Sequence, residues 1–251
     1  MPLLFRAFVL VHIACGTVGL VSFWGPVLSR KGASLHRSSG RIFTYAMLAT
    51  GTAAIGISTC TLLDPLGCHP HLVGRIDPRL GLFDAALVRG IFGWMMLYLA
   101  VLTINLAWYG RLCVLNQRHH ARNRTRLNVL LQALLLVLAL NCAWQGVLLR
   151  QPLMIGICVI GIATVVTNVA FLATTTPARN RWLLEHIKAL VGAGISVYTA
   201  FFAFGAVRLL PSLALNPFLW AIPLAVGLTL IVYHQRRVRR GYAPGRRPTE
   251  A

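Results

Sequence analysis

The chain has 251 residues, of which 57% are hydrophobic and only 12% charged, and its mean hydropathy is +0.70. This excludes an ordinary water-soluble domain, whose core could not absorb so much apolar surface. The net charge of +19 could suggest nucleic-acid binding, but the basic residues lie between apolar runs without an aromatic-studded surface, so we expect no nucleic-acid partner.

Seven apolar runs are long enough to cross a hydrocarbon core of ~30 Å as helices that rise ~1.5 Å per residue. They do not alternate in polarity as the strands of a membrane β-barrel would. The sequence therefore predicts an all-α integral membrane protein of about seven transmembrane helices. In chain order these are roughly residues 4–28, 42–63, 91–108, 127–149, 152–174, 189–210 and 217–233.

Lysine and arginine are concentrated in every second connection between these runs and after the last run. Segments 30–41, 111–126, 179–188 and 236–247 are basic, whereas the intervening connections carry few cations. Because short basic loops stay in the cytoplasm, we predict an N-terminus outside and a cytoplasmic C-terminus. The bilayer and its anionic lipid headgroups are the expected partners, and the oligomeric state is left open.

The sequence divides into one transmembrane domain and a short tail. Residues 1–235 form the predicted helical domain, and residues 236–251 form a basic cytoplasmic tail. The Pro and Gly residues of this tail oppose a helix, so we expect it to be disordered.

His12 lies about eight residues into the first predicted helix, where an ionisable side chain is costly. It could be a neutral imidazole hydrogen-bonded to a backbone carbonyl or a threonine. Alternatively, it could serve a cofactor, a metal or a proton relay. Polar residues in the fourth and fifth helices are better explained as interhelical hydrogen-bonding groups. These are Asn141, Gln145, Thr164, Thr167 and Asn168.

Histidines from three predicted cytoplasmic connections form the most informative pattern. His36 lies in the first, the adjacent pair His119 and His120 in the second, and His186 in the third. Two imidazoles at matched depth can ligate a b-type haem, and three can bind a transition metal. Adjacent residues diverge on a helix, so at most one of the pair can face a shared site. The alternative is that these are ordinary solvated basic loops.

Charged residues beside these histidines could support such a site. Arg37 and Arg41 are available to anions. Glu185 precedes His186 and could form a proton-handling pair with it or orient it as a ligand. The alternative for Glu185 is a helix-start residue that complements the helix dipole.

The connection between the second and third predicted helices reads Cys68-His69-Pro70-His71, near Asp64 and Asp77. Its residue types suit a metal, but their spacing matches no strong template, which favours an ordinary Pro-bent loop. A disulfide between Cys60 and Cys68 is conceivable.

Three segments carry a resemblance to a known family. They are His12-Ile13-Ala14-Cys15-Gly16, the basic stretch 30–41, and Glu185-His186-Ile187 followed by Thr199-Ala200-Phe201. These segments resemble bacterial multi-pass membrane proteins of unknown function, those of domain of unknown function 2306 or a close relative. The resemblance implies a helical inner-membrane protein with recurring histidines and a further histidine near Tyr198 in relatives, but no particular activity.

Two functional hypotheses follow. The first is a membrane redox protein that holds b-type haem or a transition metal through His36 and His186, with His119 or His120, and with His12 as a relay. The second is a non-enzymatic transporter or accessory subunit whose histidines are structural. It is favoured by the lack of a phosphate-binding loop, a zinc-protease helix, a nucleophile elbow and a haem-attachment motif. Whether the protein is an enzyme stays open.

Overall fold

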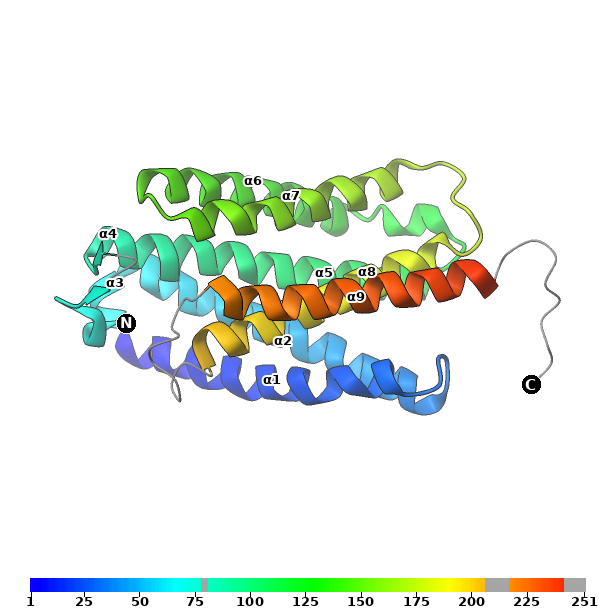
Figure 1. Cartoon of the computed structure of the whole chain (residues 1–251), viewed down its shortest axis with the longest axis horizontal. Helices are drawn as coiled ribbons and strands as arrows, with labels where there is room; N and C mark the ends of the chain where they lie inside the picture. The colour runs from blue at the N-terminus through cyan, green and yellow to red at the C-terminus, as the bar shows by residue number, and fades with distance from the viewer. Residues whose placement is uncertain (78–80, 206–216, 242–251) are drawn as a thin grey trace.

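The computed structural model describes residues 1–77, 81–205 and 217–241 of the chain. It is a bundle of long helices that run lengthwise beside one another (Figure 1). The long helices are α1 (Pro2–Leu28), α2 (Ser34–Leu63), α5 (Met96–Asn116), α6 (Arg126–Leu148), α7 (Pro152–Ala173), α8 (Arg181–Ala200) and α9 (Pro217–Gly241).

Short elements connect or extend these helices. They are α3 (Pro65–Cys68), α4 (Ala85–Val88), the π-helices η2 (Arg89–Met95) and η4 (Phe201–Gly205), and the 3-10 helices η1 (Pro70–Leu72) and η3 (His120–Asn123). Strands β1 (Ile76–Asp77) and β2 (Gly81–Leu82) pair antiparallel, with Ile76 opposite Leu82. Apart from this small hairpin, the described part of the chain has helices as its only regular secondary structure.

Six helical segments of the described residues are long and apolar enough to cross a membrane. Many of their large apolar side chains are exposed, including Leu10 and Val21, as expected of surfaces that face lipid. The predicted fold class, an all-α multi-pass membrane protein, is therefore confirmed. The six segments are Pro2–Leu28, Ser34–Leu63, Ala85–Asn116, Arg126–Leu148, Pro152–Ala173 and Arg181–Ala203.

The seventh predicted span, residues 217–233, corresponds to α9, which packs along α8. This helix continues through Gly241, so the predicted start of a disordered tail at residue 236 is wrong for residues 236–241. Residues 236–240 contain no Pro or Gly that would end the helix before Gly241. The rest of the predicted tail lies outside the described residues.

Several helices also begin well before their predicted apolar runs. α2 starts at Ser34 rather than at residue 42, and α8 starts at Arg181 rather than at residue 189. A hydrophobicity criterion finds only the part of a helix that lies in hydrocarbon, whereas long basic side chains let a helix continue into the headgroup layer. His36 and His186 therefore lie on helices, and their prediction as loop residues is wrong.

α5 occupies the centre of the bundle, where it packs against α2, α6 and α8, whereas α1 lies against α2 at the periphery (Figure 1). Tyr98 and Tyr109 of α5 are fully buried. Glycines allow close approach: a Cβ at Gly51 would lie 3.1 Å from the carbonyl oxygen of Ala100, and one at Gly110 would lie 3.0 Å from Cβ of Ala189.

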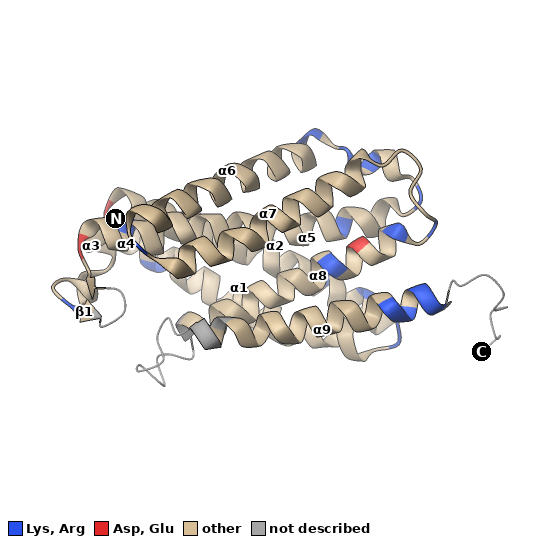
Figure 2. Cartoon of the chain, turned by 45° about the horizontal axis from the view of Figure 1, so that its top comes forward, with Lys and Arg blue, Asp and Glu red and all other residues tan. Residues whose placement is uncertain are grey.

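Figure 2 shows that lysine and arginine collect at the end of the bundle where α9 ends, here called the basic end. The loop before α2, η3 and the start of α8 lie at this end (Figure 1). Asp64 and Asp84 cap short helices at the opposite end. The charge separation inferred from the sequence is therefore present in three dimensions, while the orientation in a membrane stays a prediction.

Two glycines of α7 provide a matched test of this packing. A Cβ at Gly161 would lie 2.5 Å from the hydroxyl oxygen of Tyr98, which cannot easily move because it is buried and donates to the carbonyl oxygen of Ile157 at 2.9 Å. Gly156 has nothing within 4 Å of such a Cβ. We expect Gly161→Ala to destabilise the fold by about 1–3 kcal/mol and Gly156→Ala to be nearly neutral. Thermal unfolding in detergent measures this, and equal unfolding temperatures for the two variants would contradict the packing.

Candidate functional site

Three histidines of the bundle share one local geometry. In each, Nδ1 lies 3.1 Å from a backbone carbonyl oxygen of a neighbouring helix. A carbonyl oxygen only accepts hydrogen bonds, so Nδ1 must carry the proton, and Nε2 of the neutral ring keeps its lone pair. That tautomer suits a haem or metal ligand, and the hydrogen bond also ties two helices together. The pairs are His12 with Thr50, His36 with Pro26, and His186 with Gly110.

His36 and His186 lie together at the basic end. His36 is in the first turn of α2, and His186 is in the second turn of α8. α8 packs on both α1 and α2, and the two imidazoles are close enough to interact electrostatically. The structure thus places this predicted pair at one end of the bundle, on two helices that touch.

The end of α1 explains how His36 is held. The last carbonyls of a helix lack helical donors, and here side chains replace them. The ammonium of Lys31 donates to the carbonyl oxygens of Pro26 at 2.6 Å and Val27 at 2.7 Å, and His36 donates to the same Pro26 oxygen. Gly32 adopts φ +81° in the tight reversal into α2. Partial burial and the nearby Arg237 lower the pKa of Lys31.

The adjacent histidines of the next connection do not join this pair in a metal site. His119 is exposed, whereas His120 is buried with its ring centroid 4.4 Å from that of Phe171. Neither ring nitrogen of His120 has a hydrogen-bond partner. Among the described residues, no three His, Cys, Asp or Glu side chains are grouped so that they could hold a metal ion. The described arrangement therefore does not form the predicted three-histidine metal site.

Glu185 is buried and fully engaged. Its carboxylate accepts from Nε of Arg181 at 3.0 Å, pairs with the ammonium of Lys188, and accepts from the hydroxyl of Tyr109 at 3.1 Å. Lys188 also donates to the hydroxyl of Thr167 at 3.1 Å. The cluster links α8 to α5 and α7, so it fixes the helix that carries His186. The buried carboxylate of Glu185 is therefore compensated by two cations, Arg181 and Lys188.

The two predicted supporting arginines are exposed. Arg37 faces outward from α2, and Arg41 lines a shallow groove between α1 and α2 together with Cys15 and Tyr45. The guanidinium of Arg111 lies 4.7 Å from the ring centroid of Tyr45. Both predicted arginines remain accessible to anions.

A buried chain of amide side chains was missed by the sequence analysis, apart from Asn168. Asn168 donates to Asn105 and to Gln132 at 3.2 Å each, and Gln132 donates to Asn128 at 3.3 Å. All four are almost fully buried and join α5, α6 and α7. The spacing of Asn128 and Gln132, one helical turn apart in an apolar run, is the signal that could have revealed them.

Tyr198 lies in the segment where the family resemblance implies a further histidine. Its hydroxyl donates to the carbonyl oxygen of Leu20 at 2.9 Å and accepts from the indole of Trp24 at 2.6 Å. Tyr198 therefore connects α8 to α1, which is the same kind of interhelical contact that the three histidines make.

The loop at the opposite end of the bundle is held by an aromatic contact. The ring of His69 lies between Phe5 and Phe92, with centroid distances of 5.1 Å and 5.0 Å, and Nε2 lies 3.0 Å from the hydroxyl of Thr61. Cys60 and Cys68 are buried free thiols, and burial raises the pKa of Cys68. The conceivable disulfide is not formed in this structure.

In comparisons with known proteins, no family model, no curated protein and no solved structure matches the chain. The resemblance drawn from the sequence segments therefore stays a prediction.

Glu185 gives a testable stability difference. Its side chain is 4% exposed, whereas that of Arg181 is 44% exposed. Glu185→Gln leaves Lys188 without its carboxylate partner and should cost roughly 3 kcal/mol. Arg181→Gln removes a half-exposed partner and should cost less than about 1 kcal/mol. Unfolding in detergent compares the two, and an equal loss would mean that Glu185 is not the centre of the cluster.

The stability of the fold should depend on pH through His69. Burial, and secondarily repulsion from His71, lower its pKa from 6.5 to about 4. Between these values the unfolded chain binds a proton that the folded chain does not. The contribution of neutral His69 to stability is therefore complete above pH 6.5 and is lost as the pH falls towards 4, by about 1–3 kcal/mol in all.

The measurement is the unfolding temperature against pH for the wild type, His69→Gln and His71→Gln. We expect a shallower slope only in His69→Gln, because His71 is exposed. Identical slopes for all three proteins would show that His69 is not the titrating group.

Proposed function

We propose that the protein is a multi-pass membrane redox protein that binds b-type haem through His36 and His186. The observation that carries this proposal is the paired geometry of the two imidazoles. Both are fixed at Nδ1 by a carbonyl of a neighbouring helix, both have Nε2 available to a ligand, and they interact across touching helices.

The number of ligands favours haem over a bare metal ion. The porphyrin supplies four ligands to the iron, so two imidazoles complete the coordination. Structural zinc sites commonly take four protein ligands, and catalytic ones take three. The described part of the chain brings no such trio together, whereas it does bring two histidines to the same end.

The charge at the basic end supports the same choice. The propionates of haem are anionic, and the exposed Arg37, Arg41 and Arg237 lie on α2 and α9, which reach this end. Bound haem would supply one-electron chemistry. The chain's own contribution is to orient the two imidazoles through Pro26 and Gly110, and to fix α8 through Glu185.

The remaining parts of the proposal concern location and proton movement. The segregation of basic residues supports placement in a bacterial inner membrane with the basic end in the cytoplasm. His12 has the same tautomer in the interior of the α1–α2 pair. It is thus suited to accept a proton at Nε2 between the two ends of the bundle.

A second candidate function is a transporter or accessory subunit without redox chemistry. It is favoured by the fact that each Nδ1–carbonyl hydrogen bond already joins two helices, which gives each histidine a structural role. This alternative predicts that the histidine variants lose stability without losing any bound group.

An absorption spectrum of the protein purified from cells supplied with haem tests the proposal. We expect an intense visible haem band in the wild type and in His119→Ala, because His119 is an exposed control on the same end. The band should be lost in His36→Ala and in His186→Ala, while circular dichroism shows that both remain helical. A wild-type protein without haem, or variants that retain full haem content, would overturn the proposal.

A further inference from the structure

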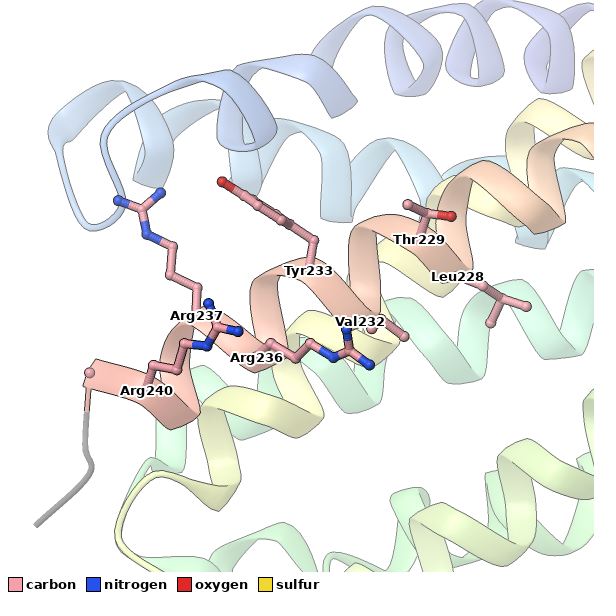
Figure 3. A pocket seen from close by; sticks show the side chains of 8 residues that line it. Leu228, Thr229, Val232, Tyr233, Arg236, Arg237 and Arg240 are labelled. Carbon is pink, nitrogen blue, oxygen red and sulfur yellow. The ribbon is translucent and has the colours of Figure 1, made fainter.

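A groove of about 870 Å³ follows one face of α9 at the basic end (Figure 3). The residues that line it recur at successive turns of this one helix, apolar first and basic afterwards. They are Leu228, Thr229, Val232, Tyr233, Arg236, Arg237, Arg240 and Gly241.

The apolar part of this groove is not covered by protein. α9 packs against α8, yet Leu228, Val232 and Tyr233 are 49%, 44% and 57% exposed. From Leu228 to Arg240 the helix rises about 18 Å. That length is close to the depth of one membrane leaflet with its headgroups, about half of the 40–45 Å bilayer.

Among the described residues, the basic part of the groove has no counter-ion. Arg236, Arg237 and Arg240 are exposed, and both ion pairs found within the described ranges belong to Glu185. Figure 3 shows Arg237 extending towards the loop between α1 and α2, and Tyr233 pointing towards the same helical hairpin. Lys31 of that loop interacts electrostatically with Arg237, which adds a further cation. None of the described residues therefore supplies an anion that neutralises this cluster.

We propose that this groove is a specific binding site for one anionic phospholipid. An acyl chain would lie along Leu228 and Val232, and the phosphate would be bound by Arg236 and Arg240. The order of apolar and basic residues along α9 matches the order of chain and headgroup in a lipid, and guanidinium groups bind phosphate through paired hydrogen bonds. Tyr233 lies between the two parts, where an amphipathic ring is favoured. This inference does not depend on haem binding.

The neighbouring Arg239 supplies a matched control. It is exposed on the same segment of α9, carries the same charge, and does not line the groove. We would compare the wild type, Arg236→Gln, Arg240→Gln and Arg239→Gln. Each would be purified in a mixture of phosphatidylglycerol and phosphatidylcholine, and retained lipid would be measured by native mass spectrometry.

We expect the wild type and Arg239→Gln to retain one phosphatidylglycerol in preference to phosphatidylcholine. Retention should fall about five-fold or more in Arg236→Gln and in Arg240→Gln, because each loses one headgroup contact worth about a factor of five. Equal retention in all four proteins would overturn the proposal. Displacement of the lipid by inorganic phosphate alone would also overturn it, because it would identify a site for a free anion.

Discussion

The structure depends on one constraint, which is that polar groups within a membrane must find their partners inside the protein. The bundle satisfies many of these groups with a few recurring contacts, although the ring nitrogens of the buried His120 have no hydrogen-bond partner. Histidines donate to carbonyls of neighbouring helices, Glu185 is shared by two cations and a phenol, and amide side chains from α5, α6 and α7 form a buried chain. These contacts determine which helices touch, and they also fix the chemical state of the side chains that could bind a cofactor.

The fold class could be predicted from the sequence because the length of an apolar run shows whether it can cross the hydrocarbon core of a bilayer as a helix. Helix ends could not be predicted equally well, since α2 and α8 continue through basic residues that reach the headgroup layer. That error placed His36 and His186 in loops, whereas the structure has them on helices. The prediction that the two histidines lie at the same end of the bundle still held, because the order of the connections along the chain decides which end each connection reaches.

The contacts that a residue makes with residues of other helices could not be predicted from the sequence. Nothing in the order of residues indicates that His36 meets the Pro26 carbonyl, or that His120 turns towards Phe171 and away from a common site. The buried amide chain was missed for the same reason. A single polar residue in an apolar run has an evident role only once a second helix places a hydrogen-bond partner beside it. The two ends of the molecule differ accordingly. The basic end combines the imidazole pair with exposed arginines, and the other end carries a short aromatic-lined loop around His69.

The central claim is that the bundle itself sets the tautomer of the three imidazoles that are hydrogen-bonded to neighbouring helices, leaving Nε2 available on each. Nitrogen NMR of the histidine-labelled protein in lipid bilayers at neutral pH measures this directly, before any cofactor is added. The account predicts signals of Nδ1-protonated neutral rings for His12, His36 and His186. Signals of Nε2-protonated rings at these three positions would contradict it.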